Sequence, residues 1–270
     1  MLITLSILGL LFLILYLGNE RLAVQFRSQV KTLFNQSNAN TTQVFHSNLL
    51  ENLPEPVERY FKYVLKEGQP YINYVRLKHD GQFKTGLDKQ WIVIKGEEYF
   101  TTETPSFIWK GTTNLFTARD MYMGNKGRLV VSLLSIYNVV DAQGEQYNQG
   151  ELLRWLSESI WFPTNLLPSE RLNWEAIDSN SAKLNFSYNG LKLYFVTTFN
   201  ANGEIIQMET KRFMDKERLE NWVIKASNYK EMNGVKVPTT AEAIWRLADR
   251  DYPYAKFNVT ALEYDVTELF

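Results

Sequence analysis

The spacing of hydrophobic residues divides the chain into three parts. Residues 1–19, MLITLSILGLLFLILYLGN, hold no charged side chain. At about 1.5 Å per residue, a helix of this length just spans roughly 30 Å of hydrocarbon. Residues 53–68 carry apolar side chains at helical spacing, and from Tyr71 onward apolar and polar residues alternate. The pattern therefore predicts a transmembrane helix, a short amphipathic helix and a long run of strands.

The alternating region is punctuated by dipeptides that favour tight turns. Two-residue hairpins need positive φ angles, which these pairs tolerate. They predict on the order of ten strands, and the absence of βαβ patterns favours antiparallel pairing. So many strands twist and curl. We therefore predict a mainly β (α+β) fold, a large curled, half-barrel-like antiparallel meander with a central helix, preceded by the transmembrane helix. The dipeptides are Asp80-Gly81, Asn189-Gly190, Asn202-Gly203 and Asn233-Gly234.

One apolar stretch, RWLSESIWFPTNLLPSERLNW, interrupts the meander at residues 154–174. Residues 148–161 have helical spacing, with Asn148 and Glu151 in the positions of a capping box. Pro163 ends this helix, because it lacks an N–H group and restricts the residue before it. Residues 162–168 are expected to continue as an irregular apolar strap. Helix and strap are the available cover for the concave face of the sheet, and they leave either a dry core or an apolar cavity.

These segments predict three regions along the chain: residues 1–19 form a transmembrane anchor, residues 20–52 a juxtamembrane helix and linker, and residues 53–270 the β domain. A cleaved signal peptide is the alternative for the first region. It is disfavoured because no basic residue precedes the apolar run and YLGNERLA is a poor cleavage site. We expect a single-pass membrane protein. Arg21, Arg27 and Lys31 favour a cytoplasmic domain by the positive-inside rule, but the side of the membrane stays open.

Composition excludes several classes of function. The 270 residues carry a net charge of −1 and no long basic run, which argues against a nucleic-acid partner. The chain has no cysteine, so disulfides, thiolate metal sites and cysteine nucleophiles are excluded. The remaining partners are the membrane, through the N-terminal helix, and a lipid or other apolar ligand. A protein partner and the oligomeric state are left open.

Four stretches in the same order carry a family resemblance: LPEPVERYFKYVL, FTARDMYMGNKG, GELLRWLSESIWFPTNLLP and VKVPTTAEAIWRLADRDYPYAKFNV. Together they resemble a bacterial family of membrane-anchored proteins with no assigned function. The W-x-P-T-x-L-L-P signature at residues 161–168 and the triplet Ala118-Arg119-Asp120 are its most specific parts. The predicted architecture is also similar to LolA- and LolB-type lipoprotein carriers. That similarity implies acyl chains held against a curled sheet, and neither resemblance assigns a catalytic residue.

Familiar catalytic motifs are missing from the sequence, which contains no G-x-S-x-G, H-E-x-x-H, G-x-x-x-x-G-K-[ST] or G-x-G-x-x-G. His46 near the linker and His79 beside a predicted turn are interpreted as exposed polar residues rather than as a metal site. Ser227 and Lys230 match S-x-x-K formally, but a strand would turn them to opposite faces. We therefore expect no cofactor and no metal.

The Arg119-Asp120 pair is a candidate for ligand binding. If residues 116–123 form a strand, Arg119 shares its face with two methionines and Asp120 points the other way. An arginine on an apolar face needs a partner. Arg119 is therefore predicted either to capture a phosphate or carboxylate head group in the concavity or to pair across the sheet with a carboxylate such as Glu242.

Large aromatic residues and two glutamates complete the candidate site. The tryptophans either line a pocket or fill the core, and both alternatives stay open. Glu151 and Glu158 lie seven residues apart and so share one helix face. They are a conceivable acid/base pair, against capping for Glu151 and solvent or arginine pairing for Glu158. The tryptophans concerned are Trp109, Trp155, Trp161, Trp174 and Trp245.

Three hypotheses follow from these patterns. The leading one is a non-enzymatic, membrane-anchored protein that binds a lipid or other apolar ligand in the concave face of the sheet. The second is an enzyme on a lipid-like or glycan substrate that uses Arg119 and carboxylates converging in one cavity. The third is a structural or assembly module with a solidly packed sheet and no pocket.

Overall fold

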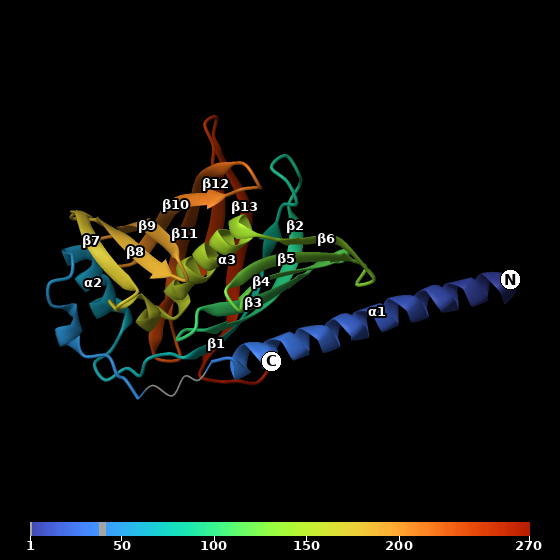
Figure 1. The fold of residues 1–270 in the computed structure, drawn as a ribbon, viewed down its shortest axis with the longest axis horizontal. Coiled ribbons are helices and arrows are strands. Elements are labelled where there is room, and N and C mark those ends of the chain that lie inside the picture. Colours follow the sequence, from blue (N-terminus) through green and yellow to red (C-terminus); the bar gives the residue numbers. More distant parts are fainter. Residues whose placement is uncertain (1, 38–41) are drawn as a thin grey trace.

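The computed structural model describes residues 2–37 and 42–270, and in this part of the chain thirteen strands form one antiparallel sheet (Figure 1). This confirms the predicted mainly β class with a curved meander and a central helix. The first six strands are β1 (Tyr74–Phe83), β2 (Ile92–Thr101), β3 (Ser106–Thr112), β4 (Phe116–Met123), β5 (Lys126–Leu133) and β6 (Tyr137–Gln143). The remaining strands are β7 (Leu172–Asp178), β8 (Ser181–Tyr188), β9 (Leu191–Phe199), β10 (Ile205–Phe213), β11 (Leu219–Met232), β12 (Val235–Arg246) and β13 (Asp251–Tyr264).

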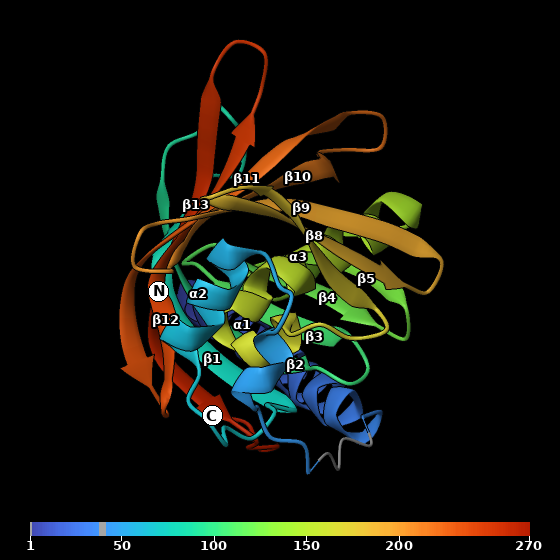
Figure 2. The same ribbon diagram turned by 90° about the vertical axis from the view of Figure 1, so that its left-hand side faces the viewer.

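The path of the chain places a helix inside the curve of the sheet. Strands β1 to β6 run in order to one edge, and β7 to β13 run from the opposite edge back to β1, which pairs with β13. The chain must therefore cross from edge strand β6 to edge strand β7. It does so through α3 (Glu145–Glu158), η2 (Ser159–Trp161) and η3 (Pro163–Leu166). Figure 2 shows α3 enclosed between the two halves of the sheet.

The main hydrophobic core fills the concave side of the sheet. The inward residues of the strands pack there against α3, the η2–η3 strap and α2 (Glu55–Val64). Pro56 lies in the first turn of α2, where its missing N–H is not needed. The strap is held by polar contacts as well, since Trp161 Nε1 donates to Pro238 O at 3.0 Å and Trp174 Nε1 donates to Leu166 O at 2.9 Å. The strap is thus a fixed wall of the domain.

The N-terminal helix covers the other face of the sheet. Helix α1 (Leu2–Asn35) continues without interruption beyond the apolar run, as the predicted juxtamembrane helix requires. Its second half buries Phe26, Val30 and Leu33 against Tyr99 and Ile108 on the convex face. Its first half projects away from the domain (Figure 1). The helix is therefore docked on the sheet ahead of the predicted linker, of which residues 38–41 lie outside the described part of the chain.

Three of the four turn predictions are confirmed. The pairs Asn189-Gly190 and Asn233-Gly234 have positive φ angles between paired strands, and Gly203 lies in the β9–β10 turn. The Asp80-Gly81 prediction is wrong, because both residues lie within β1. A Cβ at Gly81 would stand 2.2 Å from Lys256 O, so this glycine permits close approach of β13 and makes no turn.

The predicted start of the central helix is also wrong. Helix α3 begins at Glu145, with Gly144 as the preceding residue, so Glu151 lies in its interior. Asn148 does not cap the helix, because its Oδ1 accepts a hydrogen bond at 2.8 Å from the backbone N of Gly127 on β5. The absent side chain of Gly127 allows this contact, since a Cβ there would lie 2.1 Å from Tyr147 O. Asn148, which the sequence predicted as a helix cap, instead joins α3 to β5.

Candidate functional site

An apolar cavity of about 850 Å³ lies between the concave face of the sheet and α3. Its walls come from strands on both halves of the sheet and from the turns at one end of it. Apolar side chains make most of the lining, among them Ile94, Trp109, Leu129, Trp161, Ile224, Trp245 and Phe257. The volume falls within the roughly 300–1,000 Å³ typical of ligand sites. The third hypothesis predicted a solid core without such a space.

Strand alternation selects which side chains reach the cavity. On β4, Phe116, Ala118 and Asp120 point inward and line it. The alternate residues Arg119 and Met121 point to the convex face, where α1 covers them. Both faces of β4 are therefore covered. The face toward the cavity carries Asp120, and the face toward α1 carries Arg119.

A buried polar cluster forms part of the cavity wall. Arg154 on α3 is its centre: Nη1 lies 2.8 Å from Asp120 Oδ2, Nη2 3.0 Å from Glu98 Oε1, and Nε 2.8 Å from Glu158 Oε1. Glu151, one helical turn before Arg154, lies 3.5 Å from Nη2 of Arg212. We call these six residues the Arg154 cluster: Glu98, Asp120, Glu151, Arg154, Glu158 and Arg212. Four carboxyl groups thus surround two guanidinium groups, and the cluster has an excess of acid.

Burial sets the proton content of this cluster. Desolvation raises the pKa of Glu98, Asp120 and Glu158 above their ordinary values, although the nearby Arg154 opposes the shift. Desolvation, with the charge of Asp120, raises the pKa of Glu151 to about 8. Burial lowers the pKa of Arg154, but the surrounding carboxylates outweigh it and raise that pKa well above its ordinary value. At neutral pH the arginine is charged and Glu151 holds a proton.

Three oxygens of the cluster are left without a hydrogen-bond partner. They are Asp120 Oδ1, Glu151 Oε2 and Glu158 Oε2, and all three residues line the cavity. Glu151 is 96% buried, being only 4% exposed. Buried polar atoms are normally paired. The arrangement therefore offers hydrogen bonds to the polar group of a ligand whose apolar part lies against the tryptophans.

A histidine and a tryptophan brace the cavity wall. Trp109 Nε1 donates to His79 Nε2 at 2.8 Å, and the His79 ring stacks on Phe257 with 4.0 Å between centroids. Burial, helped by the charge of Arg154, lowers the pKa of His79 to about 3, so the ring is neutral and can accept. The prediction that His79 is exposed is wrong, because Asp80-Gly81 makes no turn there. His46 is exposed as predicted and contacts Glu67.

The predicted ligand-site residues divide into two groups. Trp109, Trp161 and Trp245 line the cavity together. Trp155 lies behind the lining: it packs against Phe186 and its Nε1 donates to Thr101 O at 3.0 Å. Trp174 likewise packs in the core against Phe199. Ligand contact by the first three tryptophans stays a prediction.

Arg119 and Glu242 lie elsewhere. Arg119 Nη1 donates to Gln29 Oε1 on α1 at 3.0 Å, on the convex side of the sheet. Glu242 accepts from Lys256 at 3.0 Å, so the predicted pairing of Arg119 with Glu242 is wrong. The second hypothesis required Arg119 and a carboxylate in one cavity. The cavity instead brings carboxylates together with Arg154 and Arg212, which the sequence reasoning did not select.

A signal for Arg154, the missed centre of the cluster, exists in the sequence. Glu151, Arg154 and Glu158 are spaced i, i+3 and i+7, which places them on one helix face. Arginine pairing of Glu158, one of the predicted alternatives, is confirmed by the contact with Arg154. Glu98 and Arg212 come from distant strands, and only the strand order brings them to this helix.

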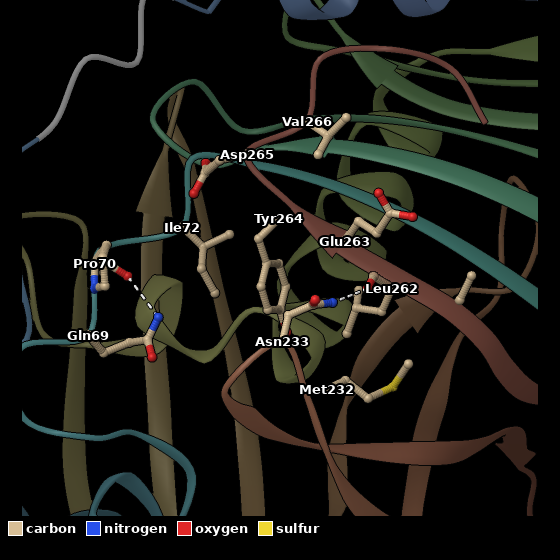
Figure 3. A pocket seen from close by; sticks show the side chains of 11 residues that line it. Gln69, Pro70, Ile72, Met232, Asn233, Leu262, Glu263, Tyr264, Asp265 and Val266 are labelled. Carbon is tan, nitrogen blue, oxygen red and sulfur yellow. Dashed lines mark hydrogen bonds between the residues drawn. The ribbon is translucent and has the colours of Figure 1, made fainter.

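The structure has a second, more open depression on another side of the domain (Figure 3). It lies near the end of β13, between the segment before β1 and the β11–β12 turn. Asn233 reaches across it and donates to Leu262 O. Within residues 2–37 and 42–270, no group of three or more His, Asp or Glu side chains is arranged to hold a metal ion. The depression therefore holds no candidate metal site among the described residues.

The fold and the cavity define the class of protein: a curved antiparallel sheet wrapped around a crossing helix, with an apolar cavity between them. The chain belongs to a family of unknown function, DUF6544, whose model matches residues 43–257. This match confirms the resemblance carried by the signatures at residues 53–65, 116–127 and 161–168.

The chain is similar to two solved structures at low sequence identity. One is a LolA superfamily protein from Nitrosomonas europaea, with 12% identity and a TM-score of 0.43 over 77% of this chain and 91% of that one. Another is a putative outer membrane lipoprotein-sorting protein domain from Vibrio parahaemolyticus, with 9% identity and a TM-score of 0.38 over 72% of this chain and 86% of that one. Curated proteins give no match.

Proposed function

We propose that this protein is held in a membrane by the first half of α1 and binds one apolar chain, such as the acyl chain of a lipid, in the cavity beneath α3. The observation that carries the proposal is the 850 Å³ space, lined mainly by apolar side chains, between the concave face of the sheet and α3. Apolar cavities of this kind bind apolar ligands because water gains little by entering them.

The anchor is supported by the exposure of α1. In the part of the chain that the structure describes, α1 is the one helix long and apolar enough to cross a membrane. Leucines and other large apolar residues from Leu5 to Leu17 are exposed on all sides. A helix that is apolar all round is stable only inside a protein or a bilayer. A cleaved signal sequence remains the competing explanation of the same segment.

The Arg154 cluster bears on which ligand fits. A fatty-acid anion would bring a further negative charge to a group that already has four carboxyls and two guanidiniums. A hydroxyl or amide N–H group can instead donate to the free Oδ1 of Asp120, and a hydroxyl or carbonyl oxygen can accept from the protonated Oε2 of Glu151. We therefore expect chains with a neutral polar end to bind more tightly than fatty-acid anions. This replaces the predicted capture of an anionic head group by Arg119.

Photo-crosslinking in vesicles tests the proposal with the full chain. Vesicles would contain a lipid with a photoreactive diazirine on its acyl chain, and adducts would be located by peptide mass spectrometry. We expect adducts on cavity residues such as Trp161 and Trp245 as well as on α1. The α1 adducts report membrane insertion independently of the cavity.

A matched pair of substitutions makes the experiment specific. Ala243→Trp fills the cavity that Ala243 lines, whereas Ala176→Trp adds the same bulk on an exposed position of β7. The first should remove the cavity adducts and keep those on α1, and the second should keep both. Labelling of α1 alone in the unmodified chain would refute ligand binding in the cavity.

A further inference from the structure

The turn between β5 and β6 has a composition that its geometry does not favour. Leu134 and Ser135 both have positive φ angles, 48° and 61°. Two successive residues of this kind form a turn that normally takes Asn-Gly, and a leucine there is strained. Residues 129–140, LVVSLLSIYNVV, contain no charged side chain. Strain and apolar exposure at one point call for a functional reason.

Neighbouring residues extend this turn into a patch. Leu134 N donates to Leu115 O at 2.9 Å, which ties the β3–β4 turn to the β5–β6 turn. Leu115, Leu134, Ile136 and Tyr137 are 65%, 46%, 46% and 70% exposed. We call these four residues the apolar tip. Hairpins at a sheet edge are usually protected by charge, and β6 is an edge strand.

The apolar tip lies against α1 where its exposed apolar run ends. A Cβ at Gly18 would stand 3.0 Å from Ser135 O and 3.2 Å from Ile136 Cγ1. Leu17 is exposed just before this point, and the first charged residue, Glu20, follows two positions later. In Figure 1 the β5–β6 hairpin is the part of the sheet that reaches out along α1 toward its N-terminal half.

The helix fixes this position relative to any bilayer that it crosses. α1 is continuous from Leu2 to Asn35, and its second half is packed on the sheet. No flexible segment therefore separates the apolar half of the helix from the domain. If Leu2 to Leu17 lie in hydrocarbon, Gly18 and the apolar tip lie at its boundary.

From this geometry we infer that the apolar tip is a membrane-docking surface that sits in the interfacial layer of the bilayer crossed by α1. The inference rests on the anchor in the proposed function. The interfacial layer fits better than the hydrocarbon core, because the free edge of β6 has backbone groups that hydrocarbon cannot satisfy. Tyr137 is suited to this depth, since its ring is apolar and its hydroxyl is polar.

The apolar tip also joins the bilayer to the cavity. Leu133 and Val139, which flank the turn, line the cavity and are themselves exposed. The rim of the cavity on this side is therefore part of the hairpin that meets the membrane. An apolar chain can pass between bilayer and cavity along β5 and β6 without crossing water, which removes the main barrier to its exchange.

Single cysteines in this cysteine-free chain allow a direct test. Tyr137→Cys places an environment-sensitive fluorophore on the apolar tip, and Ile177→Cys places it on an exposed position of β7, the opposite edge strand. Both full-length variants are reconstituted into phosphatidylcholine vesicles with and without lipid that carries a nitroxide quencher near the head group. We expect a blue shift and quenching at position 137 and neither change at position 177.

Each result decides between docking and its alternatives. Equal, water-like emission at both positions overturns the inference. So does shielding at position 137 that the nitroxide lipid does not quench, because a second copy of the chain would then cover the apolar tip. Cavity adducts in the photo-crosslinking experiment that persist with an unshielded tip leave the proposed function intact. A quenched tip without cavity adducts refutes ligand binding and leaves docking intact.

Discussion

Nη2 of Arg154 lies 3.0 Å from Oε1 of Glu98, and both side chains are almost completely buried. Removing the arginine leaves several carboxyl groups without a counter-charge in a medium that solvates ions poorly. We expect Arg154→Met to lower the free energy of unfolding by about 3–5 kcal/mol. Urea unfolding in detergent micelles measures this change. Lys66→Met, which breaks an exposed pair with Glu231, is the control and should leave the free energy of unfolding almost unchanged. Equal stability of the two variants would contradict the assigned role.

Glu151 should make stability depend on pH. Its pKa is raised in the folded state from 4.5 to about 8, so between these values the folded protein holds a proton that the unfolded chain releases. The stabilisation is complete below the unfolded pKa and is lost as pH rises through about 8. The Glu151→Gln side chain stays neutral, so the free energy of unfolding of this variant should fall less steeply with pH, by up to about 1.4 kcal/mol per pH unit.

Urea midpoints from about pH 5 to about pH 9 measure this difference. Glu170→Gln, on the exposed turn before β7, is the matched control and should follow the unmodified chain. Parallel profiles for Glu151→Gln and the unmodified chain would show that Glu151 is ionised in the folded protein.

His79 should not titrate near neutral pH. Burial and the charge of Arg154 lower its pKa to about 3, and its neutral Nε2 accepts from Trp109. The imidazole nitrogen signals of His79 in an NMR spectrum should therefore stay constant from about pH 5 to about pH 8. The His79→Gln variant assigns these signals by their disappearance. A pH-dependent shift of the assigned signals in this range would mean that the ring is open to water.

The alternation of β4 illustrates how far sequence reasoning reaches. The pattern correctly separated Arg119 from Asp120, because adjacent strand residues always face opposite ways. It could not tell which face is concave, since α1 buries the convex face as well and gives both faces apolar or paired residues. Arg119 was therefore wrongly chosen over Asp120, because the sequence did not show that α1 packs on the convex face of the sheet.

Turns and long-range pairs show the same limit. Asn189-Gly190 and Asp80-Gly81 are similar as local sequences. Gly81, however, is a glycine because the backbone of β13, which is distant in sequence, lies too close for a side chain. The Glu98 and Arg212 partners of α3 depend on a strand order that closes β1 against β13. The crossing helix, its proline-terminated strap and three of the hairpins follow from local patterns. The strand residues that complete the Arg154 cluster are brought to α3 only by this topology.

Tryptophan fluorescence can locate an apolar chain in the cavity. Trp245 lines the cavity, whereas Trp174 lies in the core beside Leu166. Bromine atoms on a lipid acyl chain quench only indoles that they approach closely, so brominated vesicles should quench part of the emission of the full chain. In Trp245→Phe the quenched fraction should fall, and in Trp174→Phe it should not. Quenching that is the same in both variants would place the chain outside the cavity, on Trp91 or another indole near the surface.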